Sequence, residues 1–146
     1  MEERTTIRLE QYEGFLIKRL NNKVNGTLIR TFSEKYGITA SQWGVMVILY
    51  DHPGMTSKEI QNIADIKVSS ASGILKRMLK KKLLYKKTLS KDHRASLLYL
   101  TEYSKKLVPS LINEANEFHA KMFSNFTDHE RENFRFLLQK VYNNMK

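Results

Sequence analysis

Residues 56–101 read TSKEIQNIADIKVSSASGILKRMLKKKLLYKKTLSKDHRASLLYLT, and this stretch decides the fold of the 146-residue chain. Two short helical patterns separated by a tight turn lead into two strand patterns that flank a charged turn. Between Thr56 and Arg94 there are 11 basic and 3 acidic side chains, a net charge of +8 out of +10 for the whole chain. Positive charge concentrated on a helix-turn-helix and a hairpin is typical of a module that binds duplex nucleic acid.

The composition is that of one ordinary globular domain, because 41% hydrophobic and 27% charged residues fit neither a disordered chain nor a membrane protein. No apolar run approaches the roughly 18–20 residues that a membrane span needs, and the first residues show no signal-peptide pattern. We therefore expect a cytoplasmic protein that does not bind a membrane. The chain has no cysteine, which excludes disulfides, thiolate redox sensing and cysteine-ligated zinc.

Helical patterns dominate the rest of the chain. Apolar side chains recur at every fourth residue from Tyr12 to Phe32, which predicts an amphipathic helix of roughly twenty-five residues that ends at Gly37. Residues 43–50 are apolar almost all round, so we expect them to form the central helix of the core. A further helix, over about residues 68–81, is expected to bury Ala71, Ile74, Leu75, Met78 and Leu79.

Local signals mark the other elements. The spacing of a capping box predicts three helix starts: Thr39 with Gln42, Thr56 with Glu59, and Thr127 with Glu130. Another long helix should follow Thr101-Glu102, and Pro109 is expected to kink or loosen it. Two strands, residues 84–89 and 95–100, are expected to form a hairpin around a turn at residues 90–94.

This order predicts a mainly α fold with a small β-hairpin wing, that is, a winged helix-turn-helix with a helical dimerisation region. The long first and last helices each carry an apolar stripe that must pack against something, and a second copy of the chain is the most economical partner. Some of these side chains are also expected to close the intramolecular core. The residues predicted at the dimer interface are Tyr12, Leu16, Phe134, Leu137, Leu138, Val141 and Tyr142.

Three short segments carry a more specific pattern. Around the predicted wing, Asp92-His93-Arg94-Ala95 precedes Leu100-Thr101-Glu102, a D-x-R…L-T-E arrangement. Residues 60–66 have the form of a first helix with its turn, and residues 69–83 that of a recognition helix with its exit. In this order and spacing, the segments resemble the MarR family of winged helix-turn-helix transcriptional regulators, over nearly the whole chain.

The resemblance implies a dimeric regulator that binds a pseudo-palindromic operator in double-stranded DNA, as a repressor that a small ligand relieves. It implies a single MarR-like domain, residues 1–146, with a DNA-binding part at 39–100 and dimerisation helices at 7–36 and 101–146. Small aromatic or lipophilic effectors of the family bind between the dimer helices and the winged part. Residues expected to line that pocket are Tyr12, Tyr36 and Trp43, which also fit a purely structural role in the core.

The predicted recognition helix combines hydroxyls, cations and a glycine. Serine hydroxyls in its first turns can donate or accept and therefore suit base edges: these are Ser69, Ser70 and Ser72. Gly73 is expected to let the backbone approach the groove. The cations expected to contact phosphates are Lys67, Lys76, Lys80 and Lys81, although a solvated helix face fits the same lysines. Arg77 could contact guanine, but it lies late in the helix and is therefore assigned to a phosphate.

At the wing tip, Arg94 is expected to enter the minor groove, whose negative potential is deepest over A·T tracts, with Asp92 holding the turn and Lys91 facing a phosphate. A type I turn with Arg94 in solvent fits the same residues. Two positions depart from the family pattern. Gly73 stands where a long or polar side chain is common, and Lys82 replaces the usual glycine, so that a left-handed backbone there is less favourable.

The sequence gives no support for a metal site, a cofactor site or a catalytic site. The histidines lack metal-ligand spacing, and His119 with Glu114, Glu117 or His129 has no supporting ligand set, so we expect no metal and no cofactor. No nucleophile–base pair or phosphate-binding glycine loop can be placed, so we expect no enzymatic activity. The alternative to a sequence-specific regulator is a nucleoid-type or RNA-binding winged-helix protein that acts mainly through charge. A footprint on genomic DNA separates the two.

Overall fold

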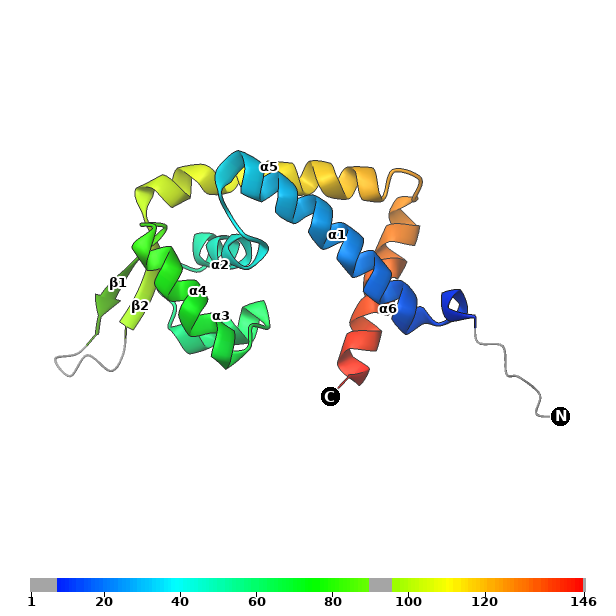
Figure 1. Ribbon diagram of the computed structural model, residues 1–146, viewed down its shortest axis with the longest axis horizontal. Helices are drawn as coiled ribbons and strands as arrows, with labels where there is room; N and C mark the ends of the chain where they lie inside the picture. The colour runs from blue at the N-terminus through cyan, green and yellow to red at the C-terminus, as the bar shows by residue number, and fades with distance from the viewer. Residues whose placement is uncertain (1–7, 90–95, 146) are drawn as a thin grey trace. The chain divides into compact units, whose positions relative to one another are not determined.

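The computed structural model describes residues 8–89 and 96–145 (Figure 1). Within these residues the chain forms six α-helices, one 3-10 helix and one antiparallel hairpin, which confirms the predicted mainly α fold with a small wing. The bounds are η1 Leu9–Gln11, α1 Glu13–Tyr36, α2 Ala40–Asp51, α3 Ser57–Ala64, α4 Val68–Lys80, β1 Leu84–Thr88, β2 Ser96–Leu100, α5 Glu102–Met122 and α6 Asp128–Asn144.

Two compact units divide the chain inside α5, at residues 1–111 and 112–146. The first unit holds α1 to α4, the hairpin and the first half of α5, and the second holds the rest of α5 and α6. α5 continues as one helix through Pro109, so this proline does not interrupt it.

The centre of the first unit is α2, as predicted. This helix packs against α1, α3, α4 and β2, and it buries Val45, Met46 and Leu49 almost completely. From α1, the fully buried Phe32 ring lies against Trp43 of α2, with 5.6 Å between the ring centroids. α2 therefore connects the long first helix to the helix-turn-helix and the hairpin.

The helix ends follow the local signals. Gly37 ends α1 in the left-handed conformation (φ 65°), and its N–H bonds to carbonyls of the last turn. α2 and α3 each begin with a complete capping box, in which the Thr39 or Thr56 hydroxyl accepts the N–H three residues on and the N-cap N–H donates to that residue's side chain. These polar side chains satisfy N–H groups that the first turn of a helix leaves without partners.

The third predicted capping box is only half formed. The Thr127 hydroxyl accepts the Glu130 N–H at 3.1 Å, as predicted. However, the Glu130 carboxylate accepts a hydrogen bond from that same hydroxyl at 3.1 Å, so its Oε1 holds the threonine side chain and not the N-cap N–H. The sequence spacing correctly predicted the start of α6, but it did not predict the hydrogen-bond partner of the Glu130 carboxylate.

The hairpin pairs from Leu84 with Leu100 to Thr88 with Ser96, so the first strand ends one residue before its predicted bound at residue 89. The tip, residues 90–95, lies outside the described residues. On the other side of β2, Met55 forms a bridge to Leu98, and the neighbouring Gly54 has φ 79°. A Cβ on Gly54 would lie 2.8 Å from the Tyr99 hydroxyl, so glycine is needed there both for space and for its backbone.

Lys82, between α4 and β1, adopts the left-handed conformation (φ 57°) that the family's usual glycine implies. This conformation costs an L-residue roughly 1–2 kcal/mol, so surrounding bonds must hold it. The Thr101 hydroxyl donates to the Lys82 carbonyl at 2.9 Å, and the buried Ser104 hydroxyl donates to the Leu83 carbonyl at 2.7 Å. The start of α5 thus fixes the turn that leads from α4 into the wing.

Candidate nucleic-acid interface

The turn between α3 and α4 is set by a single left-handed residue. Asp65 has φ 52°, and the Ile66 N–H returns to the Gln61 carbonyl at 3.1 Å, which closes the end of α3. Aspartate tolerates this conformation better than most non-glycine residues. Only residues 65–67 separate the two helices, so α4 begins at once, with Lys67 as its N-cap.

α4 has one buried face and one polar face. Its buried residues are Ala71, Ile74, Leu75 and Met78, close to the predicted stripe, and Leu79 is half-buried. The opposite face forms a stripe at spacings of three and four residues, which we call the α4 polar stripe. Its members are Ser69, Ser72, Gly73, Lys76, Arg77 and Lys80, all exposed apart from the half-buried Gly73.

Two predicted contacts lie on the flank of this stripe. Lys67 and Ser70 are exposed at the start of α4, beside a hollow of about 390 Å³ that residues of α2 and of the α3–α4 turn also line. Lys67 makes no side-chain capping bond. At the other end, the exposed Lys81 is the C-cap of the helix. The structure therefore gathers all predicted residues of this helix on or beside one solvent-facing surface.

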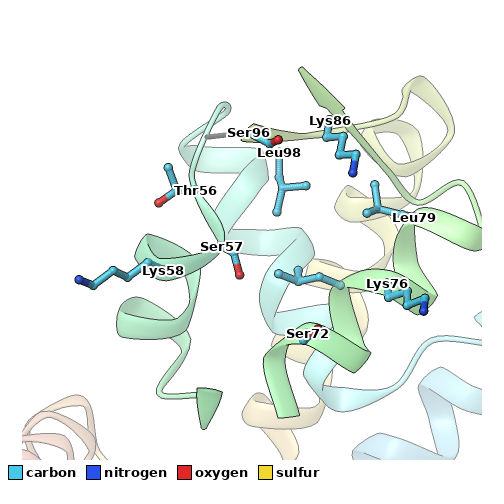
Figure 2. Close-up of a pocket in the computed structure, with 10 residues that line it drawn as sticks. Thr56, Ser57, Lys58, Ser72, Lys76, Leu79, Lys86, Ser96 and Leu98 are labelled. Atoms are coloured by element: carbon cyan, nitrogen blue, oxygen red, sulfur yellow. The ribbon is translucent and has the colours of Figure 1, made fainter. Parts of the chain in front are cut away.

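A groove of about 770 Å³ lies between α3, α4 and the hairpin (Figure 2). Its apolar lining comes from Leu75 and Leu79 of α4 and Leu98 of β2. Figure 2 shows Lys58 projecting from α3 on one side, and Lys76 and Lys86 from α4 and β1 on the other. The polar lining residues are Thr56, Ser57, Lys58, Ser72, Lys76, Lys86 and Ser96.

The charged side chains that line this groove are all positive. Among the described residues that line it, three are lysines and none is acidic, and four carry hydroxyl groups. Ammonium groups attract phosphate oxygens, and hydroxyl groups can donate to them. We call this feature the three-lysine groove. It extends the cationic surface of α4 onto α3 and the wing.

Sequence reasoning missed the part of this groove outside α4. Lys86 could have been found, because side chains two apart in a strand share a face and Lys86 follows the buried Leu84 by two residues. It also lies opposite Leu98 in the hairpin register. Lys58, in the first turn of α3, gave no such signal, since its place depends on how α3 packs beside the wing.

The wing contacts predicted for Lys91, Asp92 and Arg94 fall on residues 90–95, outside the described residues, and stay predictions. Among the described residues, no three histidine, aspartate or glutamate side chains come close enough to bind a metal ion. His119 lies with Nδ1 2.6 Å from the Ala115 carbonyl oxygen of its own helix. No helix within residues 8–89 and 96–145 combines the length and apolarity of a membrane span.

The predicted dimer residues are mostly uncovered in the single chain. In the first unit, Tyr12 and Leu16 are 55% and 43% exposed. In the second, α6 has no buried residue, and Leu137, Leu138, Val141 and Tyr142 are all exposed. Phe134 differs, because it is half-buried in an aromatic cluster with Phe123 and Phe126. Phe134 therefore packs within its own chain, as expected for some of the predicted dimer residues.

The residues predicted to line the ligand pocket do not lie together in the single chain, and the pocket stays a prediction. Tyr12 and Tyr36 stand at opposite ends of the 24-residue α1, about 36 Å apart at 1.5 Å per residue, so they cannot line one pocket within a single chain. Trp43 remains a candidate for lining the pocket, because its Nε1 is buried and has no hydrogen-bond partner among the described residues. A buried N–H without an acceptor costs about 1–3 kcal/mol.

Comparison with known proteins agrees with this geometry. The MarR family model matches residues 38–96, from the residue before the N-cap of α2 into the wing. The chain is 26% identical over 117 residues to the HTH-type transcriptional regulator YsmB of Bacillus subtilis, with 80% of each chain covered. These similarities are to a regulator of transcription rather than to an enzyme, as expected.

Two solved structures show the same fold. One is MepR of Staphylococcus aureus in a complex with DNA, with a TM-score of 0.85, 22% identity, and coverage of 92% of this chain and 98% of MepR. The other is the transcriptional regulator PcaV of Streptomyces coelicolor with its natural ligand, with a TM-score of 0.84, 20% identity, and coverage of 97% and 99%. Residues 38–96, which hold the helix-turn-helix and reach into the wing, match the MarR family of winged helix-turn-helix transcriptional regulators.

Proposed function

We propose that the protein is a homodimeric regulator that binds a pseudo-palindromic operator in double-stranded DNA and represses transcription until a small ligand releases it. The observation that carries this proposal is the α4 polar stripe, continued by the three-lysine groove onto α3 and β1. The complex of MepR with DNA, in the same fold, supports it. Two copies related by a two-fold axis would present two α4 helices to successive major grooves, about 34 Å apart.

Each part of the surface has a chemical task in this proposal. α4 has 13 residues and is about 20 Å long, and a helix of this width fits the major groove. The hydroxyls of Ser69 and Ser72 lie toward its N-terminal end, which normally reaches the base edges. Lys76 and Lys80, further along the same stripe, reach phosphates, which fix the register without reading sequence. Arg94 of the wing remains the predicted contact in the minor groove.

Footprinting on genomic DNA tests the proposal against the charge-driven alternative. A regulator is expected to protect compact, pseudo-palindromic sites, and transcription next to those sites should rise when the gene is deleted. Uniform coverage without preferred sites would favour a nucleoid-type protein, and preferential protection of RNA would favour an RNA-binding one. Either result would overturn the proposed function.

The three-lysine groove makes a quantitative prediction. Lys86→Ala is expected to weaken binding to every duplex alike, because phosphate contacts carry no sequence information. Each lost phosphate contact lowers the slope of log K against log salt by about 0.9, and a dimer loses two, so the slope should fall by about 1.8. Titrations at several salt concentrations, on an operator and on an unrelated duplex, measure both effects. Lys58→Ala should behave in the same way.

The matched control is Lys106→Ala, which removes the same charge from an exposed position on α5, away from the groove. Its salt slope should stay within about 0.3 of the unmodified protein. A Lys86→Ala protein with an unchanged slope would remove the groove from the DNA interface. A fall of only about 0.9 would indicate that one protomer, not two, contacts the duplex.

The effector part of the proposal rests on Trp43. Its Nε1 has no partner within residues 8–89 and 96–145, so a ligand with an acceptor group, such as a carboxylate, would gain a hydrogen bond there. PcaV, solved with its natural ligand, supports a ligand-responsive function. Trp43 is the only tryptophan in the chain, so its fluorescence should change when small aromatic acids bind and release DNA. DNA release without any change at Trp43 would place the effector elsewhere.

A further inference from the structure

The α4 polar stripe contains an arginine that folds back over a glycine. A Cβ built on Gly73 would lie 3.3 Å from Nη1, 3.8 Å from Nη2 and 3.9 Å from Cζ of Arg77. The guanidinium therefore lies against the Gly73 backbone, one turn before its own Cα. One turn of helix is about 5 Å, so the charged group is shifted toward the N-terminal half of α4.

The backbone itself gives no reason for glycine at this position. Gly73 lies inside α4, and its φ is not positive, unlike Gly37 and Gly54. A glycine inside a helix costs stability relative to alanine. In α1, by contrast, a Cβ on Gly26 would meet nothing within 4 Å. The distinctive feature of Gly73 is thus the Arg77 guanidinium, which lies so close that an added Cβ would have to shift it by a few tenths of an ångström.

The Arg77 guanidinium is available for a ligand. It has no hydrogen bond or ion pair among the described residues, and α4 contains no acidic side chain. On the same stripe, the exposed Ser69 and Ser72 lie toward the N-terminal end of α4. A planar guanidinium with several N–H donors can form two parallel hydrogen bonds to O6 and N7 of guanine, the commonest specific contact in the major groove.

We propose that Gly73 and Arg77 form one reading unit, in which the space at Gly73 lets the Arg77 guanidinium reach a guanine in the major groove of each half-site. This inference rests on the proposed function, and it replaces the expectation of a phosphate contact for Arg77. It also gives Gly73 a role other than the close approach of backbone and DNA. The departure from the family pattern at residue 73 becomes a determinant of specificity.

The test compares the unmodified protein with Gly73→Ala, Arg77→Ala and the double variant, each used to select binding sequences from random duplexes. The unmodified protein should select a guanine in each half-site, and Arg77→Ala should lose that preference and bind the selected operator about 10- to 100-fold more weakly. Gly73→Ala should weaken this binding about 10-fold by displacing the guanidinium, yet raise Tm by about 3 °C, as alanine favours a helix. The double variant should bind the operator less than about twofold more weakly than Arg77→Ala alone, because the guanidinium that alanine at residue 73 would displace is already absent.

Each other outcome has a distinct meaning. If Gly73→Ala weakens operator binding as much in the Arg77→Ala protein as in the unmodified one, Gly73 acts by letting the helix backbone approach the DNA. The proposed reading unit is then wrong. If Arg77→Ala weakens all duplexes alike and selects the same sequence, Arg77 contacts a phosphate, and the inference fails while the proposed function stands. If the unmodified protein selects no sequence, the proposed function itself fails. Gly26→Ala, in open space on α1, serves as the control and should raise Tm without altering the selected sequence.

Discussion

Replacing Leu138 by glutamate is expected to abolish the proposed dimer and to weaken operator binding by more than about 100-fold. Leu138 is 41% exposed in the single chain and lies on the α6 stripe with Leu137, Val141 and Tyr142. In a dimer this stripe would be covered, and a carboxylate there would lose its water without gaining a partner, which costs several kcal/mol. A monomer binds one half-site only, so it loses the gain from the second, tethered recognition helix.

Sedimentation measures the first effect and operator titration the second. The Leu138→Glu protein should sediment as a 17.2 kDa species, and the unmodified protein at twice that mass. Asn133→Glu is the control, because it adds the same charge to the same helix at an exposed position off the stripe. A Leu138→Glu protein that remains a dimer with unchanged affinity would remove α6 from the interface. A Leu138→Glu dimer with weakened binding would point to an effect on the α6 fold instead.

The helix ends of this fold could be predicted because the signals are local. The capping boxes at Thr39 and Thr56 and the left-handed Gly37 involve side chains and backbone groups within a few residues of each other. The same holds for the hairpin strands, whose alternation and turn residues are contiguous. Lys82 is the exception, since the sequence made a left-handed backbone there less favourable and the structure nevertheless shows one. Distant bonds from Thr101 and Ser104 hold it there.

The site was less predictable, because it depends on packing. Residues on α4 were found from helical spacing alone, but the three-lysine groove joins Lys58, Lys76 and Lys86 from three elements. No local pattern relates α3 to β1. The role proposed for Gly73 was equally hidden from the sequence, because it depends on the conformation of the Arg77 side chain and not on the backbone. The predicted ligand pocket stays a prediction, since Tyr12 and Tyr36 lie at opposite ends of α1 in the single chain.

Truncating Phe32 to alanine is expected to lower the free energy of unfolding by about 3–5 kcal/mol, the usual cost of removing a fully buried aromatic ring. Phe32 is 0% exposed, and its ring lies 5.6 Å from that of Trp43, so the loss leaves a cavity where α1 meets α2. Domains of this size are stable by only about 5–15 kcal/mol, so the change is a large part of the total. Urea unfolding followed by far-UV circular dichroism, at one fixed protein concentration, measures it.

The position of Phe32 also connects this stability prediction with the proposed function. The proposed dimer residues Tyr12 and Leu16 lie at the start of α1, and the buried Leu28 and Phe32 lie in its second half. The Phe32 ring is thus one of the apolar contacts through which this helix is anchored to α2. Tyr103→Ala removes an aromatic ring that is 62% exposed and should cost less than about 0.5 kcal/mol. If Phe32→Ala cost no more than Tyr103→Ala, α1 would not be anchored to α2 through this ring. A signal from an effector could then not pass along α1 to the DNA-binding surface by rigid packing.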